Sequence, residues 1–260
     1  MPDLSAGQFQ LVYNLLSLTV ATMLASGLFF FGSRTHVAHR YRPALLVSAI
    51  VVWIAGYHYF RIFQSWDAAF VSGADGLYTE SGKFFNDAYR YADWLITVPL
   101  LLVELVAVMA LAKDEGRSLL KKLVIASVLM IAFGYPGEVS ENTTTKFIWW
   151  GAAMVPYLYI YAALWSKMKP VIAANPGRIG DLLALARNVL IVTWLFYPVS
   201  YLAPVLGLGG ATGEVFLQVG YTIADITAKA GFGVVIYMIA AARTEAEGGL
   251  ATATEAAPAV

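Results

Sequence analysis

The sequence contains no cysteine, and only 13% of its 260 residues are charged. Without cysteine, the protein has no disulfides, no thiolate metal sites and no thiol nucleophiles. Lysine and arginine together number 17, as do aspartate and glutamate, so the net charge of zero argues against a nucleic-acid partner. The first ten residues lack a basic segment followed by a cleavage site, so we expect no removable signal peptide.

Apolar residues are abundant instead, at 59% of the chain, which is outside the range of soluble globular proteins. The apolar runs are long and continuous, as in membrane helices, and are not the short alternating segments of a membrane barrel. We predict a single domain over residues 1–260, an all-α membrane protein with a seven-transmembrane-helix bundle and a disordered tail at 244–260. The predicted spans lie near 8–33, 43–66, 85–112, 117–136, 145–168, 178–204 and 213–243.

The basic residues are unevenly shared between the two sets of loops, and cytoplasmic loops are the ones enriched in lysine and arginine. One set contains Arg34, Arg40, Arg42, Lys113, Arg117, Lys121, Lys122, Lys167, Lys169, Arg178, Arg187 and Arg243. The other set contains only Arg61, Lys83 and Lys146. We therefore predict an extracellular N-terminus and a cytoplasmic C-terminus in a cell (inner) membrane, with the odd-numbered helices running inward.

Lys229 falls near the middle of the seventh span, where a free charge is costly. Asp225 precedes it by four residues, about one helical turn, and is a ready counterion on the same face. Ala228, Ala230 and Gly231 leave space for a bulky group on the lysine. The alternative is a structural Lys-Asp pair that joins helices.

The third span contains four polar residues in the apolar run RYADWLITVPLLLVEL: Arg90, Asp93, Thr97 and Glu104. Asp93, Thr97 and Glu104 share one helical stripe about 16 Å long. Asp93 is nearer the outside and Glu104 nearer the cytoplasm, as in a proton relay. The alternative is that these carboxylates hold the bundle together by hydrogen bonds.

These two motifs resemble those of the microbial (type 1) rhodopsins, and the resemblance extends over all seven spans. It implies that Lys229 carries all-trans retinal as a protonated Schiff base and that Asp225 lies beside it. It also implies that Asp93 is the primary counterion and proton acceptor, Thr97 its hydrogen-bonding neighbour and Glu104 the cytoplasmic proton donor. The Asp-Thr-Glu set is similar to that of the proteorhodopsin and xanthorhodopsin group of outward proton pumps. Chloride pumps lack the first aspartate and sodium pumps have Asn-Asp-Gln at these three positions, so both functions fit this sequence poorly.

Elementary electrostatics agrees with these roles. A protonated imine beside Asp93 and Asp225 is held charged by two anions, and we expect Arg90 to compensate the repulsion between them. If light turns the N–H away from its counterions, Asp93 becomes the better base and a proton moves outward. Glu104 has leucine and valine neighbours, so we expect it to hold a proton at neutral pH and to resupply the imine.

The resemblance also implies a retinal pocket of aromatic, methionine and small residues. Ordinary packing aromatics are the alternative for any one of them. The matching positions are Trp94, Met130, Gly134, Met154, Tyr157, Trp194, Tyr197, Pro198 and Tyr201.

His58 is the only histidine within a predicted span. The resemblance implies that it contacts Asp93 and adjusts its protonation, as a pH switch does. A satisfied core histidine is the alternative. The resemblance further implies that Tyr59 and Tyr197 hydrogen-bond the carboxylate of Asp225.

Three positions refine the comparison with this group. Aligning on Pro156 puts Trp150, and not Gly151, at the opening beside the retinal ring, so we expect no carotenoid antenna. The outer ends of helices six and seven offer Glu214 but no evident pair of glutamates like the release group of haloarchaeal proton pumps. Leu101 matches the tuning position and favours green absorption. The group commonly forms trimers or pentamers, so a homo-oligomer is expected.

Two other function classes stay open. A sensory photoreceptor would share the pocket and signal to a partner, although Glu104 favours pumping because sensors need no rapid donor. A retinal-free transporter or receptor would leave Lys229 unmodified.

Overall fold

A computed structural model of the chain describes residues 1–74, 76–140, 142–203 and 206–250. In this part of the chain, seven helices are long and apolar enough to cross a membrane, as predicted. The first five are α1 (Ala6–Ser33), α2 (Arg42–Ala69), α3 (Tyr89–Met109), α4 (Lys113–Glu138) and α5 (Thr143–Ala173). The sixth is α6 (Arg178–Tyr201), and α7 (Gly210–Asp225), η3 (Ile226–Gly231) and α8 (Phe232–Ala246) form the seventh. Short 3-10 turns, η1 (Arg34–His36) and η2 (His39–Tyr41), connect α1 to α2.

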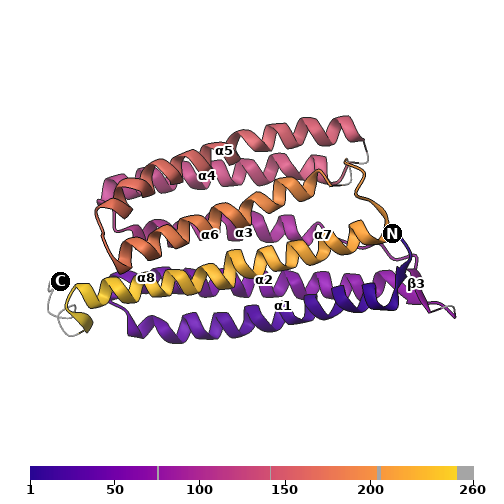
Figure 1. Ribbon diagram of the computed structural model, residues 1–260, viewed down its shortest axis with the longest axis horizontal. Coiled ribbons are helices and arrows are strands. Elements are labelled where there is room, and N and C mark those ends of the chain that lie inside the picture. The colour runs from indigo at the N-terminus through magenta and orange to yellow at the C-terminus, as the bar shows by residue number, and fades with distance from the viewer. Residues whose placement is uncertain (75, 141, 204–205, 251–260) are drawn as a thin grey trace.

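The helices lie side by side in one elongated bundle (Figure 1). Helices that follow one another in the chain pack together, and the last helix closes the bundle against α1, α2 and α6. The chain begins at one end, and α8 finishes at the other (Figure 1). In the most apolar window of each span, 67% of α3 and 61% of the last helix are buried, against 22% of α5. The two helices that carry the polar motifs are therefore the most enclosed.

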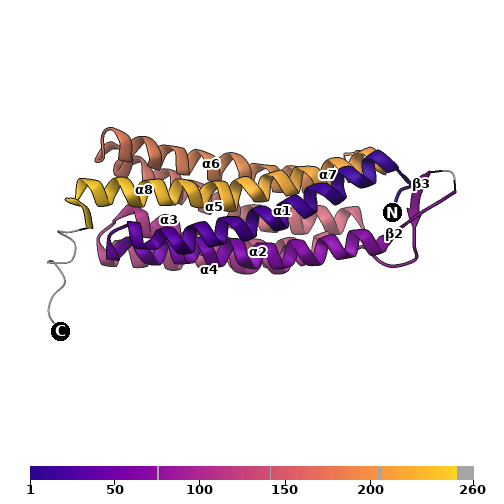
Figure 2. The same ribbon diagram turned by 90° about the horizontal axis from the view of Figure 1, so that it is seen from below.

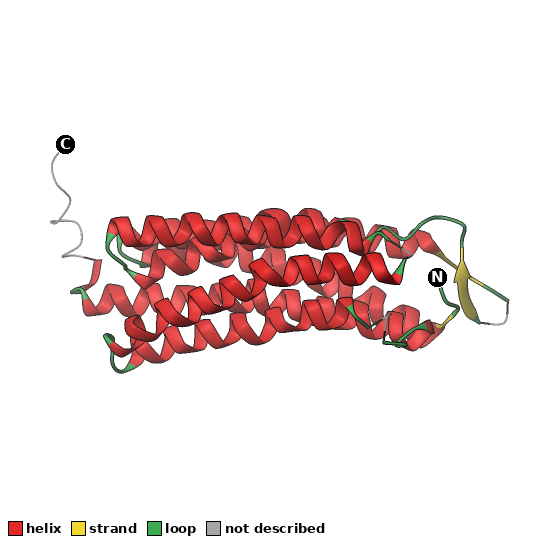
Figure 3. Ribbon diagram, turned by 90° about the horizontal axis from the view of Figure 1, so that it is seen from above, coloured by secondary structure: helices red, strands yellow, loops and turns green. Residues whose placement is uncertain are grey.

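A small three-stranded antiparallel sheet covers the end of the bundle where the chain begins, which we call the outer end (Figures 2 and 3). Its strands are β1 (Leu4–Ser5), β2 (Phe70–Ser72) and β3 (Leu77–Glu80), in the order β1-β3-β2. The register pairs Leu4 with Tyr78 and Phe70 with Glu80. The N-terminal segment is thus fixed to the long loop between α2 and α3.

The third helix is shorter than the predicted span of 85–112. At its start, the side chain of Asn86 accepts a hydrogen bond from the backbone of Ala88, a local turn that competes with helix. At its end, Ala110 is left-handed, with φ of 54°. Arg243 then donates hydrogen bonds to the carbonyls of Val108 and Met109, which have no partner within the helix.

The tail predicted to be disordered from residue 244 begins as helix, because α8 continues to Ala246. Thr244 is buried, and its hydroxyl oxygen accepts a hydrogen bond from the backbone N–H of Ala38. This tertiary contact holds the last turn in place. Residues 251–260, for which disorder was also predicted, lie outside the described residues.

Candidate functional site

Lys229 lies at the centre of the bundle with only 2% of its surface exposed. It belongs to η3, a six-residue π-helical segment inside the last span, and such segments occur often at functional sites. Its Nζ is 2.5 Å from Oδ2 of Asp93 on α3 and 2.9 Å from Oδ1 of Asp225 on α7. Both carboxylates are 1% exposed. The lysine nitrogen and the two carboxylates therefore meet away from bulk solvent.

The two carboxylates have unequal surroundings. Asp225 accepts hydrogen bonds from the hydroxyls of Tyr59 (2.7 Å) and Tyr197 (2.6 Å) and a longer one from the indole of Trp94 (3.4 Å). Asp93 accepts one from Lys229, and its Oδ1 is buried without a hydrogen-bond partner in the described part of the chain. Hydrogen bonds to the charged form stabilise that form, so Asp225 is held as an anion more firmly than Asp93. Of the two, Asp93 is the better placed to take up a proton.

His58 and Thr97 lie close to Asp93 without hydrogen-bonding its carboxylate. The Nδ1 atom of His58 is 3.8 Å from Oδ1 of Asp93 and 3.0 Å from the carbonyl of Ile54. The hydroxyl of Thr97 donates to the backbone carbonyl of Asp93 at 2.9 Å. Threonine within a helix commonly bonds the carbonyl four residues earlier, which uses its single proton.

Arg90 is buried one helical turn from Asp93, but it points away from the carboxylates it was expected to compensate. Its guanidinium pairs with Asp87 and donates to Oε1 of Gln218 at 2.6 Å. It also lies 5.1 Å from the ring centre of Tyr221. Within the described residues, no hydrogen bond or ion pair joins it to Asp93 or Asp225. Its partners Asp87 and Gln218 lie toward the outer end of the bundle.

Glu104 lies on the other side of Lys229, fully buried on α3. Its Oε2 accepts a hydrogen bond from the hydroxyl of Ser48 on α2, and its Oε1 has no hydrogen-bond partner among the residues that the structure describes. Leu101, Leu102 and Leu105, close to it on the same helix, are also buried. Within the described residues, this is a carboxyl group in an apolar shell with one hydrogen-bond partner.

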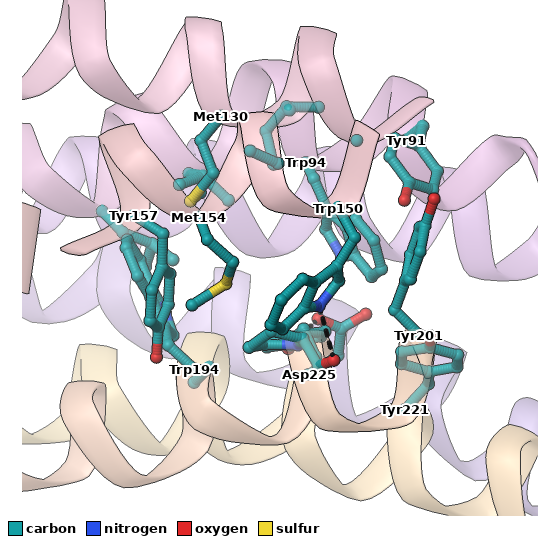
Figure 4. A pocket seen from close by; sticks show the side chains of 18 of the residues that line it. Tyr91, Trp94, Met130, Trp150, Met154, Tyr157, Trp194, Tyr201, Tyr221 and Asp225 are labelled. Carbon is teal, nitrogen blue, oxygen red and sulfur yellow. Dashed lines mark hydrogen bonds between the residues drawn. The ribbon is translucent and has the colours of Figure 1, made fainter. Parts of the chain in front are cut away.

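An elongated, almost wholly apolar pocket extends from Lys229 between α3, α4, α5 and α6. Figure 4 shows Met154, Tyr157 and Trp194 at one end of it, and Tyr91, Tyr201 and Tyr221 at the other. All the pocket positions predicted from the sequence line it: Trp94, Met130, Gly134, Met154, Tyr157, Trp194, Tyr197, Pro198 and Tyr201. Tyr59 does not, because it faces Asp225 from α2.

Several residues of the site were missed by sequence reasoning. Tyr221 precedes Asp225 by four residues and lines the pocket, so helical spacing could have identified it. Tyr91 also lines the pocket. It stands next to Arg90 in the sequence, but it is not part of the polar stripe of α3 from which the site was predicted. Ser48 hydrogen-bonds Glu104, and Gln218 hydrogen-bonds Arg90, each from another helix. Residue spacing within a single helix cannot predict such contacts.

Comparison with known proteins gives one consistent result. The model of the bacteriorhodopsin-like protein family matches residues 10–243. The green-light absorbing proteorhodopsin of Gamma-proteobacterium EBAC31A08 is 30% identical over 227 residues, covering 86% of this chain and 84% of that protein. The crystal structure of xanthorhodopsin, described as a light-driven ion pump with dual chromophore, is 50% identical with a TM-score of 0.92 and covers 96% of this chain and 99% of its own. The crystal structure of thermophilic rhodopsin is 46% identical with a TM-score of 0.91, and the match covers 95% of this chain and 99% of that one.

Seven apolar helices, a buried lysine between two carboxylates and these similarities lead to the same assignment. The chain belongs to the bacteriorhodopsin-like family and is a microbial rhodopsin, a multi-pass protein of the cell membrane whose class of activity is light-driven ion transport and not enzyme catalysis.

Proposed function

We propose that this protein is a light-driven outward proton pump with all-trans retinal bound to Lys229 as a protonated Schiff base. The family implies a retinal chromophore. The observation that carries the proposal is the placement of three buried carboxyl groups around one lysine: Asp93 and Asp225 contact its Nζ, and Glu104 lies apart in an apolar shell. A proton acceptor on one side and a proton donor on the other are what directional transport requires.

The lining of the pocket suits such a chromophore by its chemistry. Its lining is apolar and aromatic, and Trp94, Trp194 and Tyr157 supply large rings for a conjugated chain. The hydroxyl of Tyr157 is buried, and no described residue hydrogen-bonds it. When bound, retinal supplies light absorption and an isomerisation that reorients the proton on the lysine nitrogen. The chain itself holds the lysine, fixes its counterions and excludes water.

Proton acceptance is assigned to Asp93 because Asp225 is held by two tyrosines. Oδ2 of Asp93 lies 2.5 Å from Nζ, within direct transfer distance. Tyr59 and Tyr197 stabilise Asp225 as an anion throughout, so its charge orients the lysine nitrogen. His58, at 3.8 Å, is proposed to adjust the protonation of Asp93.

Proton donation is assigned to Glu104. An apolar shell favours the neutral carboxyl group, so Glu104 holds a proton ready for Nζ. Ser48 hydrogen-bonds one of its oxygens and stabilises the anion left after donation. Positively charged loops at the inner end, opposite the sheet, support a cytoplasmic location of this end, so the donor faces the cytoplasm and transport is outward.

A carotenoid antenna is not part of the proposal. Trp150 lines the pocket, and its indole donates a hydrogen bond to the carbonyl of Pro198 at 3.0 Å, from α5 to α6. Gly151 is exposed, and a side chain there would meet nothing within 4 Å. We infer that the side chain of Trp150 fills the opening that a second chromophore would need. Energy transfer to retinal from an added ketocarotenoid would contradict this.

The test is to illuminate vesicles of known protein orientation, supplied with retinal, and to record external pH with and without a protonophore. A light-driven pH change of the sign expected for outward transport, abolished by the protonophore, would support a pump. A photocycle without such a change would favour the sensory alternative. Visible absorption that persists after Lys229→Ala would refute the proposed attachment site.

A further inference from the structure

An open groove lies on the surface of the bundle between α4 and α5, which pack side by side (Figure 1). We call it the α4–α5 groove. Its volume is about 650 Å³, and it shares no lining residue with the pocket beside Lys229. In the most apolar windows of α4 and α5, only 33% and 22% of the residues are buried inside the bundle. The groove therefore faces the hydrocarbon of the membrane. Its walls are apolar and include Ile125, Leu129 and Phe133 from α4 and Val155 and Pro156 from α5.

The α4–α5 groove is polar at one end and apolar at the other. Lys122 lies 16 residues before Glu138, where α4 ends, and Tyr159 lies 16 residues after Thr143, where α5 begins. Both helices rise 1.5 Å per residue from the connection between them at the outer end, so both side chains stand at the same depth, about 24 Å from that connection. Phe133 is near the opposite end of the groove. A cation and a hydroxyl thus stand at its inner end, with hydrocarbon beyond them.

The length of the groove corresponds to one leaflet of a bilayer. Lys122 precedes Phe133 by 11 residues, which is about 16 Å along a helix and about half of a bilayer core of roughly 30 Å. Met130 and Gly134, close to Phe133 on α4, line the pocket beside Lys229, so the apolar end is level with the middle of the bundle. At the other end, the long side chain of a lysine can extend toward the head groups. The groove therefore has the length and depth of one acyl chain.

The charge of Lys122 indicates what covers the groove. Its side chain is exposed, and no ion pair joins it to any residue that the structure describes. Lys167, at the inner end of α5, is by contrast paired with Glu115 at 2.9 Å. Basic pockets between helices on the cytoplasmic side of membrane proteins bind anionic head groups. A second copy of the chain packed into the groove would bury the charge of Lys122, which is costly without a carboxylate to pair with it. The charge therefore favours an anionic lipid.

We propose that the α4–α5 groove binds one anionic phospholipid from the leaflet at the inner end of the bundle. One acyl chain lies along Leu129, Phe133 and Val155, and the phosphate contacts Nζ of Lys122. The hydroxyl of Tyr159, at the same depth, donates a hydrogen bond to the head group. This binding is independent of the proposed pump, because none of these residues lines the pocket beside Lys229.

The experiment is native mass spectrometry of the full chain in detergent, with equal amounts of phosphatidylglycerol and phosphatidylcholine that carry the same acyl chains. The protein is expected to retain one phosphatidylglycerol in preference to phosphatidylcholine. Lys122→Gln should lower this preference about fivefold, the contribution of one lysine near an anionic head group, and Lys122→Arg should keep it. Lys121→Gln is the matched control, because Lys121 is an exposed neighbour that does not line the groove. Circular dichroism and the melting temperature verify that each variant has folded.

A second measurement locates the lipid. Phosphatidylglycerol with a photoactivatable diazirine in its acyl chain should crosslink to the segments around Leu129 and Val155. Ala152→Phe places a ring in the groove and should lose both the crosslinks and the preference.

Three results would overturn the proposal. They are equal retention of the two lipids by the intact protein, an undiminished preference in Lys122→Gln, and crosslinks spread evenly over the other spans. If Ala152→Phe changes the number of subunits and leaves lipid retention unchanged, a second copy occupies the groove and the proposal is also wrong.

Discussion

The two halves of the site on either side of Lys229 differ in how their polar groups are connected. Toward the outer end, Asp93, Asp225 and Arg90 lie among tyrosines and Gln218, with hydrogen bonds between 2.5 and 3.4 Å. Toward the inner end, Ser48 is the one hydrogen-bond partner of the Glu104 carboxyl group in the described part of the chain. Within the described residues, no hydrogen-bonded chain joins Glu104 to Lys229.

This difference indicates how a proton can be made to travel in one direction. The outer half is arranged in advance, so a proton can leave Nζ without a large rearrangement. The inner half has no such hydrogen-bonded chain among the described residues, so in the proposed pump Glu104 reaches Nζ only after a change of structure. In the proposed pump, this separation keeps Glu104 from passing its proton to Nζ before the proton of Nζ has moved to Asp93.

The largest effect is expected from Asp93→Asn, which removes the acceptor from the outer half. Transport should stop, because no anion remains in direct contact with Nζ except Asp225, which Tyr59 and Tyr197 already stabilise. The visible absorption should shift to the red, because a counterion charge is lost. Absorption spectra and external pH in illuminated vesicles measure both. Asp67→Asn, an exposed aspartate on α2, is the control, and undiminished transport in Asp93→Asn would refute the assignment.

Glu104→Gln tests the inner half. We expect little change in colour, since Glu104 does not contact Lys229, and reprotonation slowed about 100-fold or more, the contribution typical of a positioned acid. Time-resolved absorption after a flash measures the rate. The matched control is Glu115→Gln, an exposed residue of α4. An unchanged photocycle in Glu104→Gln would exclude Glu104 as donor.

A smaller effect is expected from Ser48→Ala, which removes the polar contact of Glu104. Losing one hydrogen bond costs about 1 kcal/mol, so reprotonation should slow by about fivefold. Time-resolved absorption after a flash measures the reprotonation rate. Ser127→Ala is the control, because Ser127 is also buried and its hydroxyl donates to the carbonyl of Val124 in its own helix. If both alanine variants behave alike, Ser48 has only a structural role.

The smallest effect is expected from His58→Asn. At 3.8 Å from Asp93, and with 12% of its side chain exposed, the imidazole interacts with the carboxylate without a hydrogen bond. The midpoint of the pH-dependent colour change, which we attribute to Asp93, should move by about half a pH unit. This is the size expected from losing a charge interaction worth roughly 0.2–1 kcal/mol. A pH titration of the spectrum measures it, with His39→Asn in the loop as control. A titration that stays in place would leave His58 as an ordinary core histidine.

Residues that share one helix were the most predictable part of the site. The pair of Asp225 and Lys229, and the stripe from Asp93 to Glu104, follow from 3.6 residues per turn. The pocket positions were also predicted, but through the family resemblance and not through spacing. Contacts of Ser48, Gln218 and Glu138 with other helices were not predictable, because they depend on how each helix is rotated and shifted against its neighbours.

The sequence alone determined the solvent and the chemistry of this protein. Long apolar runs require a membrane, and a lysine with three carboxyl groups inside them requires a function. The tertiary structure alone decided which carboxylate the tyrosines hold, that Arg90 points outward, and that Glu104 is isolated. The physical reason is that helix geometry orders residues along one axis, whereas the charge each one meets is set by side chains from other helices.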